Sequence, residues 1–155
     1  MPLLDRNGLK PDARVPVVAP DELDAALLVR ADGEALGVAI PNSFDVVTLE
    51  PVQDRLELVS IDFPVFNDGR GFTLARALRE QGYRGTLRAS GRLVPDQFAF
   101  ALECGFDEVE IDEERLTRQP VAQWLSALAA FDIAYQNVPG RISILERRRA
   151  AREAA

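Results

Sequence analysis

Short apolar runs of strand character alternate with amphipathic helical segments over residues 56–128, and this alternation constrains the fold more than any other feature. Strands are expected at 36–40, 56–63, 85–89 and 106–111. Helices are expected at 73–81, 95–104 and 121–128. Such alternation is typical of right-handed βαβ units, whose strands are parallel. The chain is therefore expected to form a small open, mainly parallel α/β sheet of repeated βα units, half-barrel-like or flavodoxin-like in its arc. The units are too few for a closed eight-stranded barrel.

Two of the expected helices end in the same way. Gly82 and Gly105 follow their last residues, and an aromatic residue, Tyr83 or Phe106, comes next. A glycine in this position can adopt the left-handed conformation that ends a helix, and the aromatic ring can fold back on the last turn. Each pair therefore predicts a helix end that leads directly into the next strand.

Composition changes towards both ends of the chain and divides it into three parts. Residues 1–20 hold four of the ten prolines and are expected to form an extended arm, with a short strand near 15–18. Residues 21–140 are expected to form a single α/β domain that opens with a short helix near 21–28. Residues 141–155 carry five Arg and two Glu, which is typical of a basic, frayed terminal helix.

The inventory of side chains excludes several kinds of chemistry. The sequence contains no His, so it cannot form a Ser/His/Asp triad or a His-ligated metal site, and no metal or other cofactor is expected. The single cysteine, Cys104, cannot form an internal disulfide, and its position at the end of an apolar helix indicates an inert core thiol. The net charge of −7 argues against nucleic-acid binding. Without a secretory signal pattern or an apolar run that could cross a bilayer, the protein is expected to be cytoplasmic and not to bind membranes.

The loop expected after the strand at 56–63 has the composition of an anion site. Its residues before the helix are Asn67, Asp68, Gly69, Arg70 and Gly71. Free N–H groups and the dipole at a helix N-terminus favour an anion, which Arg70 could cover. Alternatively, Asp68 caps the turn and pairs with Arg70, and the loop then has a structural role only.

Charged and polar residues also follow the next expected strand. The candidate ligand-binding residues here are Arg88, Gly91, Asp96 and Gln97. At the end of a strand, Arg88 either pairs with an acid such as Asp62 or Asp68 or faces a ligand. Asp62 interrupts an otherwise apolar strand near its carboxyl end, where parallel α/β sheets place functional groups. Asp62, Asp68 and Arg88 are therefore the candidate catalytic residues, and the alternative is a buried Asp–Arg pair that fixes the two strand ends.

Several of these residues belong to a longer pattern. Its parts are Phe63-Pro64-x-Phe66-x-Asp68-Gly69-Arg70-Gly71, Gly82-Tyr83-x-Gly85-x-Leu87-Arg88-Ala89-x-Gly91, Asp96-Gln97, Gly105-Phe106-Asp107 and Tyr135-Gln136. The combined pattern resembles a bacterial family of unknown biochemistry that accompanies assimilatory sulfite reduction and is often labelled a probable oxidoreductase. Members are typically encoded beside a sulfite/nitrite reductase haemoprotein and a phosphoadenylylsulfate reductase, so the resemblance implies these enzymes as partners. The chain has Ser90 where the pattern usually has Val, and Arg92 where it often has an acid.

Three functions are consistent with these observations. The first is an accessory protein of assimilatory sulfate or sulfite reduction that binds a small oxyanion, the reductase, or both. The second is a small oxidoreductase or other enzyme of sulfite reduction that uses Asp62 or Asp68 as a general base and Arg70 and Arg88 as electrostatic stabilisers. The third is a purely structural subunit. The sequence leaves open whether the protein is an enzyme.

An open sheet also predicts association, because exposed edges and an uncovered face usually acquire a partner. Two candidate surfaces for a homo-oligomer are the short strands near the N-terminus and the helix at 121–128. Trp124 lies on the apolar stripe of this helix, so it is expected in the core or as the anchor of an interface.

Overall fold

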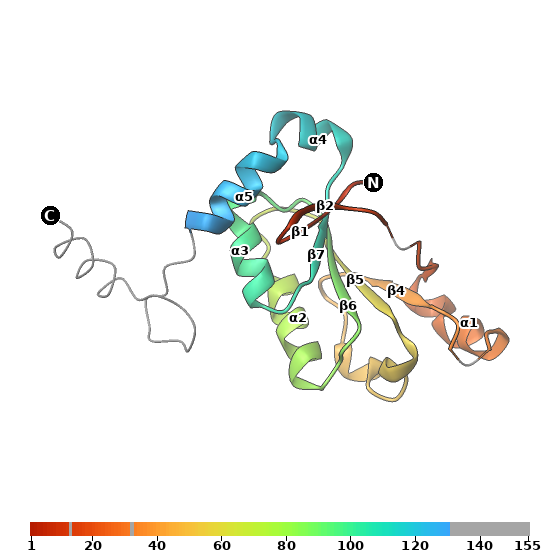
Figure 1. The fold of residues 1–155 in the computed structure, drawn as a ribbon. Coiled ribbons are helices and arrows are strands. Elements are labelled where there is room, and N and C mark those ends of the chain that lie inside the picture. The colour runs from red at the N-terminus through yellow and green to blue at the C-terminus, as the bar shows by residue number, and fades with distance from the viewer. Residues whose placement is uncertain (13, 32, 131–155) are drawn as a thin grey trace, which may run out of the picture.

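The computed structural model describes residues 1–12, 14–31 and 33–130, and their strands form one seven-stranded sheet (Figure 1). In the order in which they lie side by side, the strands are β2 (Gly8–Lys10), β1 (Leu3–Asp5), β7 (Glu108–Glu110), β6 (Thr86–Gly91), β5 (Leu58–Phe63), β4 (Gly37–Ile40) and β3 (Val17–Val18). The α-helices are α1 (Leu23–Val29), α2 (Arg70–Glu80), α3 (Pro95–Glu103), α4 (Glu113–Arg118) and α5 (Val121–Ala130). Short 3-10 helices lie at Pro20–Glu22, Val46–Leu49 and Gln53–Arg55.

Strands β3 to β7 are parallel and lie side by side in the order in which they occur in the sequence. This confirms the expected small open, mainly parallel α/β sheet. A flavodoxin-like sheet has its first strand inside the sheet, so the observed order corresponds to the half-barrel-like arc. The antiparallel hairpin of β1 and β2 pairs with β7 and ends the arc on that side.

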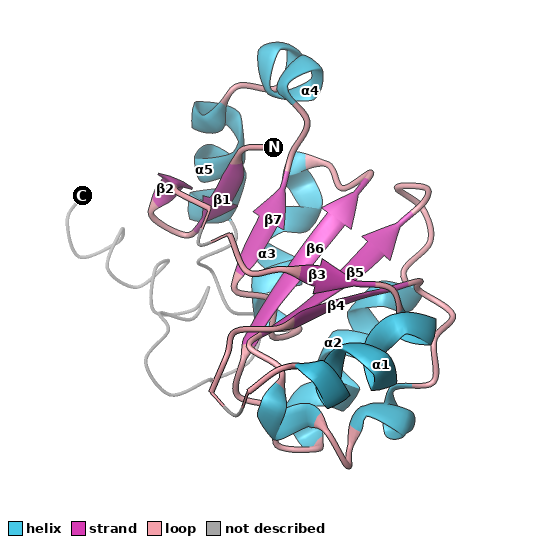
Figure 2. Ribbon diagram, turned by 90° about the vertical axis from the view of Figure 1, so that its right-hand side faces the viewer, coloured by secondary structure: helices cyan, strands magenta, loops and turns pink. Residues whose placement is uncertain are grey.

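Helices α2, α3 and α5 lie on one face of the sheet, and α1 lies on the side of the sheet where β4 is found (Figure 1). Successive residues of a strand point to opposite faces, so alternate strand residues face these helices. Val59, Ile61 and Phe63 of β5 are fully buried in this layer, with Leu78 of α2 and Phe98 of α3. Figure 2 looks onto the other face, where none of the described helices covers β5 to β7 and the segment between β2 and β3 crosses in front of the strands.

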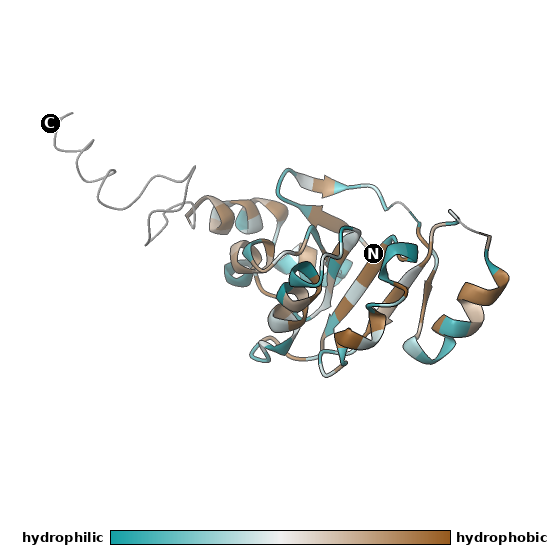
Figure 3. Cartoon of the chain, turned by 90° about the horizontal axis from the view of Figure 1, so that it is seen from below, coloured by the Kyte–Doolittle hydropathy of each residue, from teal (hydrophilic) through white to brown (hydrophobic). Residues whose placement is uncertain are grey.

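Apolar residues are concentrated in the strands and along the sides of the helices that face the sheet, and polar residues in the loops (Figure 3). The apolar stripe expected at 121–128 is the inner side of α5. Its Trp124 is 0% exposed, and its ring makes an edge-to-face contact with Phe98, with 5.8 Å between the ring centroids. Trp124 therefore belongs to the core, and its burial removes it as the anchor of an interface.

Most of the expected elements are shifted by one to three residues at an end in the structure; two of these shifts bear on the site, and one helix is new. Helix α2 begins at Arg70, three residues before the expected start, and β6 continues beside β5 as far as Gly91. Arg88 consequently lies within a strand, so the expectation that it stands at a strand end is wrong. Helix α4 was not expected, although Asp112 caps it by accepting a 2.6 Å hydrogen bond from the N–H of Arg115. An Asp followed by two Glu is the N-terminal signal that predicts such a helix.

The two glycine helix ends are confirmed. Gly82 and Gly105 have φ angles of +92° and +110°, in the left-handed region. The N–H groups of Tyr83 and Phe106 donate to the carbonyl oxygens five residues earlier, at 3.0 and 3.2 Å, and both rings are buried. This hydrogen bond and the buried aromatic residue are the features of a Schellman helix end.

The residues before 20 contribute three strands to the sheet. The strand expected near 15–18 corresponds to β3, whereas β1 and β2 were not expected, because three-residue strands are too short to show an alternating pattern. The segment between β2 and β3 keeps the character of an arm that lies on the sheet. The tail at 141–155 and the Tyr135-Gln136 pair lie outside the described residues.

Candidate functional site

The carboxyl ends of strands β5, β6 and β7 lie at one edge of the sheet, with α4 beyond the end of β7 (Figure 2). Open parallel α/β sheets bind their ligands at this edge. Phe63 and Gly91 are paired at the ends of β5 and β6. The two candidate loops of the sequence analysis therefore start from adjacent points.

Gly91 lets the loop after β6 turn directly against the end of β5. Its φ is +92°, and a Cβ atom on this residue would lie 2.4 Å from the carbonyl oxygen of Phe63 and 2.7 Å from Oδ1 of Asp62. The N–H of Arg92 donates to the same Phe63 oxygen at 2.7 Å. A residue with a side chain would push these groups apart, so Gly91 has a steric role at this edge. Asp62 is exposed, and its carboxylate makes no hydrogen bond or ion pair with any described residue.

Asp68 and Arg70 form a close pair in the loop between β5 and α2. The Arg70 guanidinium donates to both carboxylate oxygens of Asp68, with a shortest distance of 2.6 Å, and the Arg70 backbone N–H donates to Oδ1 at 3.2 Å. These hydrogen bonds hold the pKa of Asp68 far below its usual range. The carboxylate thus occupies the position that an external anion would take at the start of α2. This arrangement agrees with the alternative from the sequence analysis, in which Asp68 caps the turn and pairs with Arg70.

The buried amide of Asn42, after β4, adds a smaller effect in the same direction on the pKa of Asp68. Its Nδ2 nevertheless makes no hydrogen bond of normal geometry with the described residues. Asn67 and Gly69 are exposed in the same loop as Asp68, whereas Gly71 is already helical and buried. A Cβ on Gly71 would lie 2.5 Å from the ring of Phe63, so this glycine lets α2 pack on β5.

Gln97 joins the loops that follow β5 and β6. Its Nε2 donates to the backbone oxygen of Phe66 at 2.6 Å, and its Oε1 accepts from the N–H of Val94 at 3.3 Å. Asp96 is exposed in the first turn of α3. Gln97 therefore fixes the position of Phe66 relative to the start of α3.

A cavity of about 450 Å³ lies between these loops and α4. Residues that line it include Phe66, Arg92, Arg115, Arg118 and Gln119. Arg115 holds the loop after β6, because it donates to the carbonyl oxygens of Gly91 and Leu93 at 2.7 and 3.2 Å. Arg92 is exposed, and its guanidinium makes no hydrogen bond or ion pair with the described residues.

Two carboxylates also line this cavity. Asp112 lies 3.6 Å from the Arg115 guanidinium, and Glu114 pairs with Arg118 one helical turn away. Arg92 is therefore the one arginine of the cavity that is not committed to another described residue. Sequence reasoning noted Arg92 only as a departure from the family pattern. It missed the role of α4, whose Arg115 and Arg118 share a helix face at a spacing of three.

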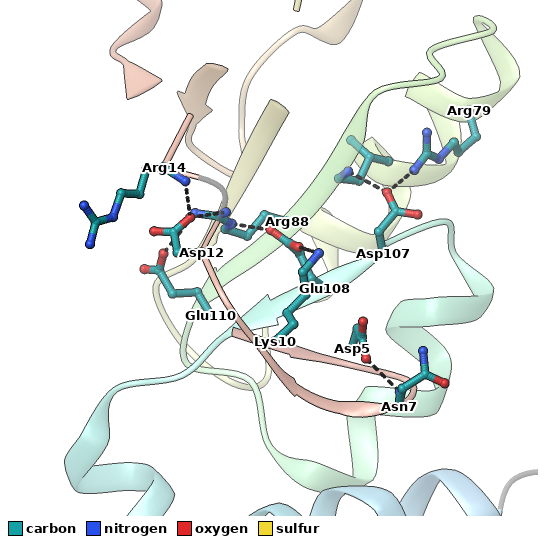
Figure 4. A network of polar contacts seen from close by, with 11 residues as sticks. Asp5, Asn7, Lys10, Asp12, Arg14, Arg79, Arg88, Asp107, Glu108 and Glu110 are labelled. Carbon is teal, nitrogen blue, oxygen red and sulfur yellow. Dashed lines mark hydrogen bonds and ion pairs between the residues drawn. The ribbon is translucent and has the colours of Figure 1, made fainter. Parts of the chain in front are cut away.

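Arg88 lies on the other face of the sheet, within a cluster of charged residues (Figure 4). We call this group the sheet-face cluster, and its members are Lys10, Asp12, Arg88, Glu108 and Glu110. Arg88 is 7% exposed; its Nε donates to Glu108 at 2.7 Å, and its two Nη atoms lie 3.3 and 3.5 Å from Asp12 and Glu110. Lys10 reaches the other oxygen of Glu108 at 2.7 Å. The cluster thus joins β6 and β7 to the N-terminal segment.

Arg88 pairs with acids, but the prediction that these acids are Asp62 or Asp68 is wrong. Strand register explains the difference, because Asp62 lies opposite Ser90 while Arg88 lies opposite Glu108. The signal that could have found the true partners is the spacing of Glu108 and Glu110, which places both on one face of β7.

The contacts of the sheet-face cluster shift the pKa of two of its members. The hydrogen bond with Glu108 raises the pKa of Lys10 above its ordinary value. The backbone N–H of Arg14 and, to a lesser extent, the Arg88 guanidinium lower the pKa of Asp12. Both shifts favour the charged forms, so the folded state stabilises the charges that hold the N-terminal segment on the sheet.

Cys104 lies directly after the last residue of α3 and is buried, as expected for a core thiol. Burial raises its pKa, although Arg76 Nη2 lies 3.7 Å from the Sγ atom and acts in the opposite direction. A thiol with a raised pKa is a poor nucleophile at neutral pH. Within the described ranges, no group of three or more Cys, Asp or Glu side chains is placed to hold a metal ion.

None of the helices in the described part of the chain is long and apolar enough to span a membrane. No curated protein matches the sequence. A family model described as "Bacterial protein of unknown function (DUF934)" matches residues 37–142. The match begins with β4 and includes the carboxyl-edge loops, the cavity and Arg88, whereas Lys10 and Asp12 precede it. The chain therefore belongs to this bacterial family of unknown function, DUF934.

Proposed function

We propose that the protein is an accessory protein of assimilatory sulfate or sulfite reduction in the cytoplasm, and that it binds a small oxyanion at the carboxyl edge of its sheet. The observation that carries the proposal is the position of Arg92, which lines the 450 Å³ cavity and has no side-chain partner among the described residues. A guanidinium binds sulfate, sulfite or phosphate through two parallel N–H groups. The connection with sulfur assimilation rests on the sequence resemblance.

The surroundings of Arg92 support an anion more than a cation. Arg115 and Arg118 are balanced by Asp112 and Glu114, so Arg92 gives the cavity its net positive charge. Val94, the residue before the first turn of α3, also lines the cavity. The positive end of the α3 dipole is therefore close to the site. The loop at Asp68 is a weaker candidate, because its own carboxylate already pairs with Arg70.

Titration with sodium sulfate, sulfite and phosphate, followed by amide chemical shifts, tests the anion site. We expect weak binding, with a dissociation constant on the order of millimolar, since one exposed charged contact contributes little free energy. Shifts should centre on residues 91–94, and Arg92→Gln should abolish them. Arg70→Gln is the matched control, because it removes an arginine from the neighbouring loop without touching the cavity. Shifts that persist in Arg92→Gln, or an unshifted spectrum with all three anions, would contradict the anion site.

The proposed partner is the sulfite/nitrite reductase haemoprotein, with the phosphoadenylylsulfate reductase as the second choice. Phe66 is 59% exposed at the carboxyl edge, and exposed aromatic side chains are common centres of protein interfaces. Light scattering at micromolar concentration, with and without each enzyme, tests this part of the proposal. We expect a complex with the haemoprotein, and the protein measured alone reports on self-association. A monomer in every mixture would contradict the partner proposal.

An enzyme is the second candidate function, and the observation that favours it is the exposed Asp62 carboxylate at the end of β5. A general base needs a carboxylate that is free to accept a proton, and Asp62 has no partner among the described residues. Asp68 is less suitable because it pairs with Arg70, and Arg88 already pairs with three carboxylates. Asp62→Asn should abolish growth on sulfate if the carboxylate is a base, while the unfolding midpoint of the purified protein stays unchanged.

A further inference from the structure

Phe66 presents a flat apolar surface at the cavity that contains Arg92. It is 59% exposed, although most phenylalanine side chains of a small domain are buried. Its loop is held in place, because Gln97 donates to the Phe66 carbonyl oxygen at 2.6 Å and the N–H of Asp68 donates to Val65 at 3.3 Å. The backbone that carries the exposed ring is therefore fixed at the cavity. An inorganic oxyanion does not use such a ring.

A ring and a guanidinium around one cavity describe a ligand with two matching parts. A flat base stacks on an aromatic side chain, and a phosphate binds a guanidinium. A cavity of about 450 Å³ falls within the size range of small-molecule sites. The lining has three arginines against two carboxylates, and a monophosphate suits this small positive excess better than a triphosphate.

We infer that this cavity binds a nucleoside monophosphate, with the base on Phe66 and the phosphate on Arg92. The inference rests on the proposed function, because Arg92 is the anion-binding residue in both. It adds that the oxyanion is one end of a larger ligand. Phe66 then distinguishes this ligand from free sulfate or phosphate.

Calorimetric and amide-shift titrations of the full chain with adenosine monophosphate, inorganic phosphate and adenosine test the inference. We expect adenosine monophosphate to bind roughly 5- to 150-fold more tightly than phosphate, because stacking of one base contributes about this factor. Phe66→Leu should reduce the affinity for adenosine monophosphate to that for phosphate and leave phosphate binding unchanged. The matched control is Phe100→Leu, which changes another partly exposed ring, 41% exposed, outside the cavity lining. Arg92→Gln should weaken the binding of both adenosine monophosphate and phosphate.

The outcomes separate the two proposals. Equal affinity for adenosine monophosphate and phosphate, both dependent on Arg92, would overturn the nucleotide inference and leave the oxyanion site intact. Tight binding of adenosine monophosphate that survives Phe66→Leu would also overturn it, because the base would then lie elsewhere. If neither adenosine monophosphate nor phosphate binds, both proposals are overturned.

Discussion

Arg88 and Arg92 are four residues apart in the sequence and lie in opposite environments. Arg88 is 7% exposed in the middle of β6 and pairs with three carboxylates. Arg92, one residue after the end of β6, is exposed at a cavity and has no side-chain partner among the described residues. The difference teaches that the end of a strand separates the two roles of an arginine. Within the sheet, acidic residues on neighbouring segments pair with the guanidinium. Beyond the end of the strand, a ligand can take the place of these acids.

Arg88→Met should give the largest effect, because it removes one of the two cations that pair with buried Glu108, each at 2.7 Å. Breaking a buried ion pair costs about 3–5 kcal/mol of unfolding free energy. We expect a loss of about 3 kcal/mol, near the lower limit of that range, because Lys10 still pairs with Glu108 at 2.7 Å. Urea unfolding followed by fluorescence of Trp124, the single tryptophan, measures the loss.

The matched control is Arg92→Met, which removes the same charge from the exposed site. A surface substitution of this kind should change the unfolding free energy by less than about 0.5 kcal/mol. Replacing Glu108 by Leu in the Arg88→Met background should recover most of the stability, because the second buried charge is then gone. Equal losses for the two arginine variants would contradict the distinction between them.

Gly91→Ala should have the next largest effect, since Gly91 is the turn that separates the two arginines. An alanine with a φ of +92° would be strained, and its Cβ would lie 2.4 Å from a backbone oxygen that cannot move freely. We expect a loss of about 2–3 kcal/mol from the strain and the contact together. Gly82→Ala is the control, because Gly82 has the same φ of +92° and no atom within 4 Å of its Cβ position. Its loss should be about 1 kcal/mol, and similar losses for both variants would show that the contact at Gly91 does not matter.

Sequence patterns predicted the sheet well because they are local. The strands and helices between Gly37 and Ala130 have the periodicity and glycine ends that hydrophobic burial requires, and most of their positions were expected. The β1–β2 hairpin was missed because its stability comes from pairing with β7, a contact between distant parts of the sequence. Tertiary pairing of this kind leaves little trace in a three-residue strand.

The candidate site was less predictable than the fold, since it depends on which side chains meet. The loop at Asp68 was singled out by its composition, yet the same composition lets Asp68 pair with Arg70. Arg88 was expected near Asp62 because the sequence predicts a strand that ends at residue 89, and register places Asp62 beside Ser90 instead. The cavity at Arg92 needed knowledge of α4, which packs beyond β7. Spacing alone does not contain that information.

Asp68→Asn should convert the loop before α2 into a site that resembles the surroundings of Arg92. The neutral amide no longer holds the Arg70 guanidinium as an ion pair, and the start of α2 loses its internal anion. Sulfate should then shift the amides of residues 69–73 in Asp68→Asn and leave them unshifted in the wild-type protein. The double variant Asp68→Asn/Arg70→Gln should lose the response. Equal shifts in wild type and Asp68→Asn would mean that pairing with Asp68 does not prevent anion binding.

The pH dependence of the sheet-face cluster should give the smallest effect. The pKa of Asp12 is lowered, so its contribution to stability is present above the ordinary Asp pKa of about 3.9 and is lost as the pH falls through the lowered value. The pKa of Lys10 is raised, so its contribution is present below the ordinary Lys pKa of about 10.4 and is lost as the pH rises through the raised value.

Asp12→Asn should therefore flatten only the acid limb of the stability profile, and Lys10→Met only the alkaline limb, so each variant is the control for the other. Urea unfolding at a series of pH values measures both limbs, and the difference between wild type and Asp12→Asn should shrink as the pH falls below about 4, near the ordinary Asp pKa. Profiles of wild type and Asp12→Asn that stay parallel across the acid range would show that the contact between Asp12 and Arg88 does not stabilise the fold. Arg88 would then depend on Glu108 and Glu110 alone, and Lys10 would be the remaining ion-pair contact from the N-terminal segment to the sheet-face cluster.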